Sequence, residues 1–374
     1  MTKAAELAKM GEVLTNSQIG GRRNIVYNGK MQVAQRGTSE TGVGATAGYF
    51  TCDRWVYSVA GSHAGRFTMT QTADGPSGFA SCLKLDCTTA DTSIAAGELA
   101  IIRQHFEGQD LQQIKKGTSD AEQLTVSFYV KASSALTFGL ELFDSDNDRQ
   151  ITKLFTTTTS WVRHEITFPA DTTGAFNNDT ERSLDLSFWI HAGSTYAGGT
   201  LNSTAFASTT TANRAAGIDS FFSSTDNEFF LTGVQMELGS VATPFEHRSF
   251  GEEYQLCQRY YQEITGSVDN SALEDAHQAM FPMLAYNTTL GLGTLTFITP
   301  MRGRPALGYS AVGHFLKYSA GRGDNVTGLA LYDGVENATT RTAYINVTSG
   351  TSTAGGGFVA AQNTAARLNF DAEL

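Results

Sequence analysis

Three carboxylates, Asp144, Asp146 and Asp148, alternate along one short segment and form the most prominent acidic cluster of the chain. Carboxylate oxygens in such a loop are the ligands that calcium prefers. The pattern is not that of an EF-hand, because Arg149 stands where a glycine must turn the loop and Phe155 where a bidentate Glu must close it. Calcium in another loop geometry therefore stays an alternative to a solvated hairpin turn, and no other cofactor is predicted.

Aromatic side chains offer a second chemistry, because proteins hold sugars by stacking on aromatic rings while a few polar groups fix the hydroxyls. The candidates for carbohydrate binding are Tyr196, Trp189, Trp55 and Tyr57. Trp55 lies in an apolar alternation and has a competing interpretation as a core residue. Trp189 follows Phe188 on a predicted strand, so one of the two is expected to point outward or into an interface. Tyr196 lies in a Gly-rich loop and is the candidate least expected to be buried.

Motifs for catalysis are not found in the sequence. A glycosidase needs two carboxylates that face each other across a sugar ring, and no motif places such a pair beside aromatic residues. The sequence has no G-x-S-x-G nucleophile elbow, and its seven histidines are scattered without the spacing of a zinc site. The four cysteines also lack metal-ligand spacing and are interpreted as reduced core residues. The chain is therefore predicted not to be an enzyme.

The composition excludes several classes of partner. The net charge is −11 and basic residues occur only in isolated pairs, which argues against nucleic acid as a ligand. No apolar stretch approaches the ~20 residues that span a bilayer, and the N-terminus lacks the apolar core of a signal peptide. We therefore expect synthesis in a cytoplasm and no insertion into a membrane. Only 17% of the residues are charged, and the abundance of Thr, Ser, Gly and aromatics favours β-structure.

The opening segment, residues 1–24, differs from the rest. Leu7, Met10 and Leu14 recur at helical spacing and predict one short amphipathic helix, followed by a Gly-rich hinge. A helix of this length is marginal alone, so it needs a partner. Three copies of itself or a docking surface on a larger particle would both serve.

Residues 25–250 show short apolar alternations separated by turn residues, which is the pattern of a β-sandwich. The clearest strands are predicted at Leu124–Val130, Leu136–Phe143, Ile151–Phe155, Trp161–Phe168, Leu184–Ile190 and Phe229–Leu238. One helical turn is predicted within 107–114.

The segment 231–262 marks a domain boundary near residue 250. Pro244 ends the last strand, and Ser249 with Glu252 matches an S-x-x-E capping box. Tyr254, Cys257 and Tyr261 follow at helical spacing and predict a linker helix. Residues 251–374 then hold this helix and a smaller β domain of about six short strands. Glu246, His247 and Arg248 are interpreted as structural, because they lie at a strand exit.

Several stretches of residues 24–262 resemble the jelly-roll domain of bacteriophage tail-fibre and related virion proteins. They are NIVYNGKMQVAQR, DRW, GQDLQQIKKGTSDAEQLTVSFYVKAS, TTTTSWVRHEITFPADT, VQMELGSVATPFEHR and CQRYYQ. FITPMRGRP and the terminal LNFDAEL resemble the second, smaller β domain of the same proteins. That jelly roll is similar in outline to carbohydrate-binding modules.

The resemblance implies an all-β protein with a short N-terminal helix, a jelly-roll sandwich and a smaller C-terminal β domain. It implies a non-catalytic tail-fibre or head-fibre subunit of the virion, made in the host cytoplasm, that contacts host-surface glycan. The implied partners are two further copies in a homotrimer, and other tail or capsid proteins through residues 1–24. A decoration or adaptor protein without a ligand is the main alternative, and a polysaccharide depolymerase is a weaker one.

Overall fold

The chain forms two compact units, which run to Glu253 and from Tyr254 to Glu373, with Leu374 grouped in the first. The computed structural model describes residues 3–4, 22–266, 278–287, 289–319, 322–332, 339–350, 355–362 and 365–374. The predicted N-terminal helix on Leu7, Met10 and Leu14 lies outside these residues. Within them, no helix has the length and apolar character needed to cross a bilayer.

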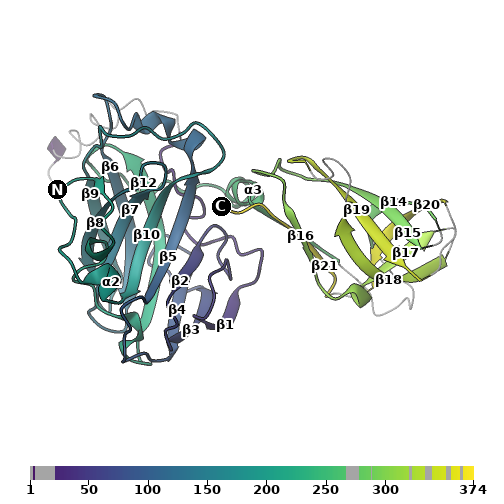
Figure 1. The fold of residues 1–374 in the computed structure, drawn as a ribbon, viewed down its shortest axis with the longest axis horizontal. Coiled ribbons are helices and arrows are strands. Elements are labelled where there is room, and N and C mark those ends of the chain that lie inside the picture. Colours follow the sequence, from purple (N-terminus) through teal and green to yellow (C-terminus); the bar gives the residue numbers. More distant parts are fainter. Residues whose placement is uncertain are drawn as a thin grey trace. The chain divides into compact units, whose positions relative to one another are not determined.

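The first unit is a sandwich of two six-stranded antiparallel sheets (Figure 1). One sheet has the order β1 (Ser39–Val43), β3 (Arg66–Thr72), β4 (Cys82–Thr89), β12 (Glu228–Leu238), β6 (Leu124–Ala132) and β9 (Val162–Phe168). The other has the order β11 (Ala207–Ser208), β8 (Arg149–Thr156), β7 (Thr137–Asp144), β10 (Arg182–Ala192), β5 (Leu99–Glu107) and β2 (Val56–Ala60). The predicted all-β, jelly-roll class is confirmed.

Alternating apolar residues build the core between the sheets. On β6, Val126 and Phe128 point inward, and on β10 Leu186 and Phe188 do the same, all without exposed surface. Phe128 and Phe188 meet edge to face with ring centroids 5.1 Å apart, so each strand packs against the opposite sheet. Burial of each such side chain contributes about 1.5–3 kcal/mol, which makes this alternation the main source of stability.

Short helices lie in the connections between strands. They are η1 (Gly108–Ile114), α2 (Ser194–Ala197), η2 (Thr211–Asn213) and η3 (Phe221–Ser223). The helical turn predicted within 107–114 is η1, whose Leu111 and Ile114 are buried in the core of the sandwich.

A hydrogen-bond network, here called the closing network, joins the two ends of the sandwich through Asn24, Asn28, Glu246, Arg248 and Glu253. Asn28 has a left-handed φ of 52°, and its backbone N–H donates to Glu253 Oε1 at 2.6 Å. The backbone N–H of Asn24 donates to Glu246 Oε2 at 2.7 Å, and Arg248 donates to backbone carbonyls of the N-terminal segment. Glu246 and Arg248 are thus structural residues, as the sequence predicted.

Helix α3 (Phe250–Gln258) begins with the predicted cap, because Ser249 Oγ accepts the backbone N–H of Glu252 at 3.2 Å. The helix ends at Gln258, so the prediction that Tyr261 lies on it is wrong. Tyr261 instead opens strand β13 (Tyr261–Thr265) and pairs with Asp371. The ladder with a strand from the end of the chain prevails there over the local helical spacing.

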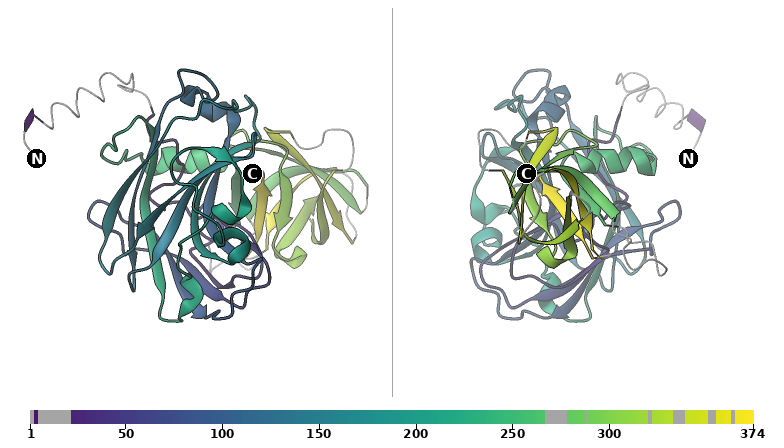
Figure 2. Two further views of the ribbon diagram at one scale, coloured as in Figure 1. Left: turned by 60° about the vertical axis from the view of Figure 1, so that its left-hand side comes forward. Right: turned by 90° about the vertical axis from the view of Figure 1, so that its right-hand side faces the viewer.

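The second unit contains a three-stranded sheet and a closed six-stranded barrel (Figure 2). The sheet has the order β13, β21 (Arg367–Asp371) and β16 (Ala306–Tyr309). The barrel has the order β14 (Gln278–Ala285), β15 (Leu290–Thr296), β19 (Thr342–Ser349), β18 (Arg322–Leu331), β17 (Phe315–Ser319) and β20 (Gly355–Ala361), with η4 (Val312–His314) before β17. The described residues of this unit thus form nine strands where about six were predicted, since several strands are too short or too Gly-rich to give an apolar alternation.

Candidate functional site

Three of the four predicted sugar-stacking residues are buried in the sandwich, so the prediction that they stack on a sugar is wrong. Trp55, Tyr57 and Trp189 have no exposed surface. Trp55 is a core residue whose indole N–H donates to Asn28 O at 3.2 Å, and Tyr57 bonds His63 through its hydroxyl at 3.0 Å. Their rings are packed against protein on both faces, so no ligand reaches them in this structure.

Trp189 lies on the outer face of its sheet, opposite in direction to Phe188, but a long connection covers it. The connection runs from α2 through η2 and includes Tyr196, whose half-buried ring lies 5.6 Å from the Trp189 ring. Arg214 covers the same indole, with its guanidinium carbon 5.1 Å from the ring centroid. The Trp189 ring points outward from its sheet, as the strand alternation predicted, but it is buried in a small second core and cannot stack on a sugar.

Two buried carboxylates on this outer face are each held by cations. Glu141 accepts two hydrogen bonds from Arg214, at 2.7 and 2.8 Å, and one from the Trp189 indole at 2.8 Å. Asp185 pairs with His105 Nδ1 at 2.6 Å and with Arg182 Nε at 2.7 Å.

Arg103 is a second guanidinium beside Asp185, 3.4 Å from its carboxylate. Burial alone would raise the pKa of Asp185, but the charges and hydrogen bonds of His105 and Arg182 outweigh burial and hold this pKa well below its usual range. A general acid for glycoside hydrolysis needs a raised pKa, which is the opposite shift.

The predicted calcium cluster is not assembled in the structure. Asp144 is fully buried and pairs with Lys116 Nζ at 2.5 Å, while Asp146 accepts hydrogen bonds from Asn177. Asp148 is exposed, with a left-handed φ of 49°. The lysine ammonium thus occupies the place a cation would take beside Asp144. Across the described part of the chain, no three acidic, His or Cys side chains gather in a metal-binding group.

Lys116 fixes the loop that follows β9. Its ammonium lies 3.1 Å from Asp171 Oδ2 and donates to the carbonyl oxygens of Thr173 and Gly174 at 2.8 and 2.7 Å. Burial alone would raise the pKa of Asp171, but Arg149, a backbone N–H and Lys116 lower it. The side chain of Lys116 is 3% exposed, so this is a buried ion cluster and not a surface pair.

The second unit carries most of the exposed large apolar side chains among the described residues. Among the described residues, the exposed large apolar side chains of Tyr254–Glu373 are Leu284, Tyr286, Ile298, Tyr309, Tyr332, Tyr344 and Phe358. The same group in the sandwich unit has three members, Ile94, Leu154 and Phe250. Exposed apolar groups concentrated in this way mark an interaction surface.

The described barrel strands direct their charged side chains inward, and they present tyrosine rings outward while Phe281 and Phe315 fill the core. Lys317 is fully buried inside, opposite Asp324 on β18, and burial lowers its pKa although Asp324 opposes this shift. On β19, Ala343 and Ile345 point inward while Tyr344 points outward. At the outward positions of the barrel strands that the structure describes, there is no Lys, Arg, Asp or Glu.

One row of outward positions runs around the barrel and holds five residues, here called the aromatic band: Tyr332, Tyr344, Pro282, Phe358 and Tyr318. The backbone N–H of Tyr332 donates to Tyr344 O, and Phe358 pairs with both Pro282 and Tyr318 across neighbouring strands. Thr294 pairs with Tyr344, and by register it lies between Tyr344 and Pro282. Adjacent strands lie about 5 Å apart, so the rings form two neighbouring pairs, Tyr332 with Tyr344 and Phe358 with Tyr318, which Thr294 and Pro282 separate.

The sequence prediction missed the aromatic band, although one signal for it was present. The stretch Thr342–Ser349 alternates Thr, Tyr, Asn and Thr with Ala, Ile, Val and Ser, which separates an outward from an inward face. The alignment of Tyr344 with Phe358 depends on strand registers that no local pattern contains.

Comparisons with known proteins show distant similarity of structure only. No family model matches the sequence, and no curated protein is similar to it in sequence. The enzymatically active domain of bacteriophage CBA120 tailspike protein 4 is similar over 57% of this chain, with 12% identity and a TM-score of 0.31; the match spans 21% of that protein.

A family 4 carbohydrate-binding module matches 56% of this chain and 97% of its own length, with 10% identity and a TM-score of 0.30. A family 11 module from Clostridium thermocellum, in complex with a mixed-linked β-1,3-1,4-tetrasaccharide, gives 10% identity and a TM-score of 0.27 over 55% of this chain and 99% of its own. These similarities are remote, and the assignment of an all-β protein with a sandwich and a barrel rests on the strands and registers of this chain.

Proposed function

We propose that the chain is a non-catalytic subunit of a bacteriophage tail or head fibre that contacts host-surface glycan through the aromatic band. The band is the observation that carries the proposal. Tyrosine rings present an apolar face and a polar hydroxyl, which suits the C–H faces and hydroxyls of sugars. The surrounding outward positions that the structure describes hold Thr, Asn, Gly and Leu without charge, which suits a neutral ligand.

The non-catalytic part of the proposal is supported by the state of the buried carboxylates. Glu141, Asp144 and Asp185 each contact a basic side chain directly. The pKa of Asp185 is also held below its usual range, which makes this carboxyl a poor proton donor. The virion part is supported by the motifs that residues 24–262 share with tail-fibre proteins.

Replacing both Tyr332 and Tyr344 with alanine is expected to weaken glycan binding at least tenfold, about 1.4 kcal/mol, because two stacking faces are lost. Binding would be measured first on an array of bacterial surface glycans and then by titration with the best ligand. Tyr309→Ala is the matched control, since Tyr309 is 40% exposed on β16, against 41% for Tyr332 and 39% for Tyr344.

Tyr309→Ala should bind within twofold of the wild type. A wild-type chain without selective array signal would contradict glycan contact and favour a decoration or adaptor protein. Release of reducing ends from host polysaccharide would instead favour a depolymerase.

We further propose a homotrimer that is attached to the particle through residues 1–24. The exposed aliphatic residues Leu284 and Ile298 support association, because they leave apolar surface in water. Native mass spectrometry of the purified protein is expected to give the mass of three chains. A monomer would contradict the trimer, and absence of the protein from antibody-labelled virions in negative-stain images would contradict the fibre role.

A further inference from the structure

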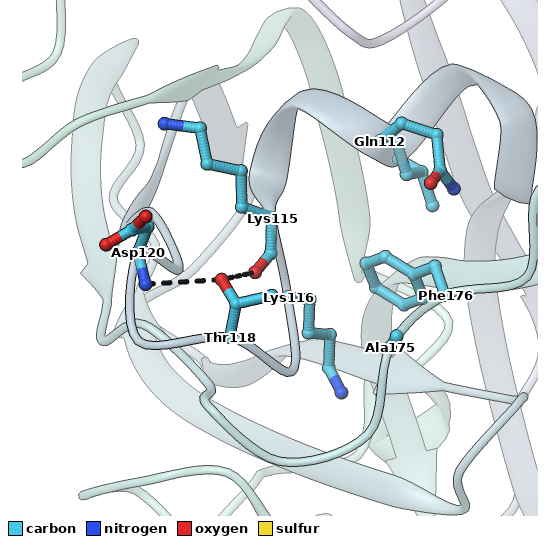
Figure 3. A pocket seen from close by; sticks show the side chains of 8 residues that line it. Gln112, Lys115, Lys116, Thr118, Asp120, Ala175 and Phe176 are labelled. Carbon is cyan, nitrogen blue, oxygen red and sulfur yellow. Dashed lines mark hydrogen bonds between the residues drawn. The ribbon is translucent and has the colours of Figure 1, made fainter.

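A pocket of about 380 Å³ opens in the sandwich unit between the end of η1 and residues 175–176 (Figure 3). Leu111, Ala175 and Phe176 form its apolar wall. The remaining lining residues are polar: Gln112, Lys115, Lys116, Thr118 and Asp120. The volume lies near the lower end of the roughly 300–1,000 Å³ of small-ligand clefts, so it suits one small ring and not an extended chain.

The polar side of the pocket is held by a tight turn. Thr118 Oγ1 donates to Lys115 O at 2.7 Å and accepts the backbone N–H of Asp120 at 3.2 Å. Gly117 makes the close approach to the opposite loop possible, because a Cβ at this position would lie 2.6 Å from Ala175 N. The turn and the opposite loop therefore keep a fixed spacing.

The apolar wall is held by the ion cluster beneath it. Lys116 turns away from Lys115 in Figure 3, and its ammonium binds Asp144, Asp171 and the carbonyls of Thr173 and Gly174. The Ala175 carbonyl accepts a hydrogen bond from Asn147 Nδ2 at 3.0 Å. The pocket is thus pre-formed, which lowers the entropic cost of binding.

The chemistry of the lining defines the ligand. An apolar wall with one aromatic ring faces a side that offers an amide, a carboxylate, a hydroxyl and an ammonium. Lys115 pairs with Glu122 at 3.1 Å and Asp120 adds a further negative charge, so the exposed rim has no excess of positive charge and disfavours an anionic ligand. A sugar ring combines an apolar C–H face with hydroxyls that both donate and accept hydrogen bonds.

We propose that this pocket binds a single neutral sugar ring, either a free monosaccharide or the terminal residue of a glycan. It lies in the sandwich whereas the aromatic band lies in the barrel, so this site goes beyond the proposed function and is tested separately from it.

Saturation-transfer NMR on the full chain would test the site with D-glucose, D-galactose and N-acetyl-D-glucosamine, and with their methyl glycosides. At least one sugar is expected to bind with a Kd on the order of 1 mM, as befits a small ligand with few contacts. Gln112→Ala and Asp120→Asn should each weaken binding at least fivefold. Gln113→Ala is the matched control, because Gln113 is also exposed on η1 but does not line the pocket.

If the methyl glycoside still binds, the ligand is the terminal residue of a glycan. If the methyl glycoside does not bind, the ligand is a free monosaccharide. The Tyr332→Ala/Tyr344→Ala chain should keep pocket binding unchanged, which separates the two sites. The site would be overturned if no sugar binds at about 50 mM, if Gln112→Ala binds like the wild type, or if Gln113→Ala loses as much affinity as Gln112→Ala.

Discussion

Replacing Asp185 with asparagine is expected to lower the free energy of unfolding of the sandwich unit by about 3–5 kcal/mol. Asp185 has no exposed surface and lies among three basic side chains, those of Arg103, His105 and Arg182. Asparagine keeps the shape of the side chain but removes its charge, so it leaves cations in a partly desolvated site without their counter-charge.

Urea unfolding followed by tryptophan fluorescence measures this effect in the right unit. All three tryptophans of the chain, Trp55, Trp161 and Trp189, belong to the sandwich. Glu165→Gln is the control, because Glu165 is an exposed partner of Arg163 and such pairs contribute about 0–1 kcal/mol. Equal effects of the two substitutions would refute the buried network as a major source of stability.

The effect of Asp185→Asn also has a defined pH dependence. The folded pKa of Asp185 is lowered, so the unfolded chain binds the proton first as the pH falls. The stabilisation is therefore complete above about pH 5 and is lost progressively below about pH 4, the usual range of an aspartate pKa. The difference in the free energy of unfolding between Asp185→Asn and the wild type should therefore become smaller as the pH falls below about 4.

Replacing Lys116 with methionine is expected to destabilise the sandwich by about 3–5 kcal/mol and to abolish sugar binding in the pocket. Methionine retains the apolar length of the side chain, but Asp144 and Asp171 lose the ammonium between them. The loop at Thr173 and Gly174 also loses two hydrogen bonds to its carbonyls.

The adjacent substitution Lys115→Met provides the comparison. Lys115 is 52% exposed and pairs with Glu122 at the surface, so its loss should cost less than about 1 kcal/mol. The same urea titration would compare the two variants. A Lys116→Met chain as stable as Lys115→Met would show that the buried cluster contributes little.

Local patterns were sufficient for most of the sandwich. The alternation in Leu124–Val130 predicts β6 because one face of the strand packs into the core, and the Ser249 cap predicts the start of α3 because its hydrogen bond is local. Tyr261 was assigned to the helix because its pairing with Asp371 is not visible in the sequence around it.

The surfaces were much harder to predict than the strands. Alternation places Trp189 on the outer face of β10, but it does not reveal that the connection carrying Tyr196 and Arg214 covers that face. The ion pair of Asp144 with Lys116 is equally invisible in the local pattern, because Lys116 comes from a distant loop. The aromatic band and the pocket both depend on contacts between segments far apart along the chain.

The closing network limits when the sandwich can fold during synthesis. Its hydrogen bond from Asn28 to Glu253 joins residues 225 positions apart, and that from Asn24 to Glu246 joins residues 222 apart. At about 5–20 residues per second, a ribosome needs roughly ten to fifty seconds to make the second partner after the first. During that interval Asn28 lacks its partner and the last central strand, β12, has not emerged. The nascent sandwich therefore has unpaired strand edges during this interval, and such edges are the sites at which chains pair wrongly with one another.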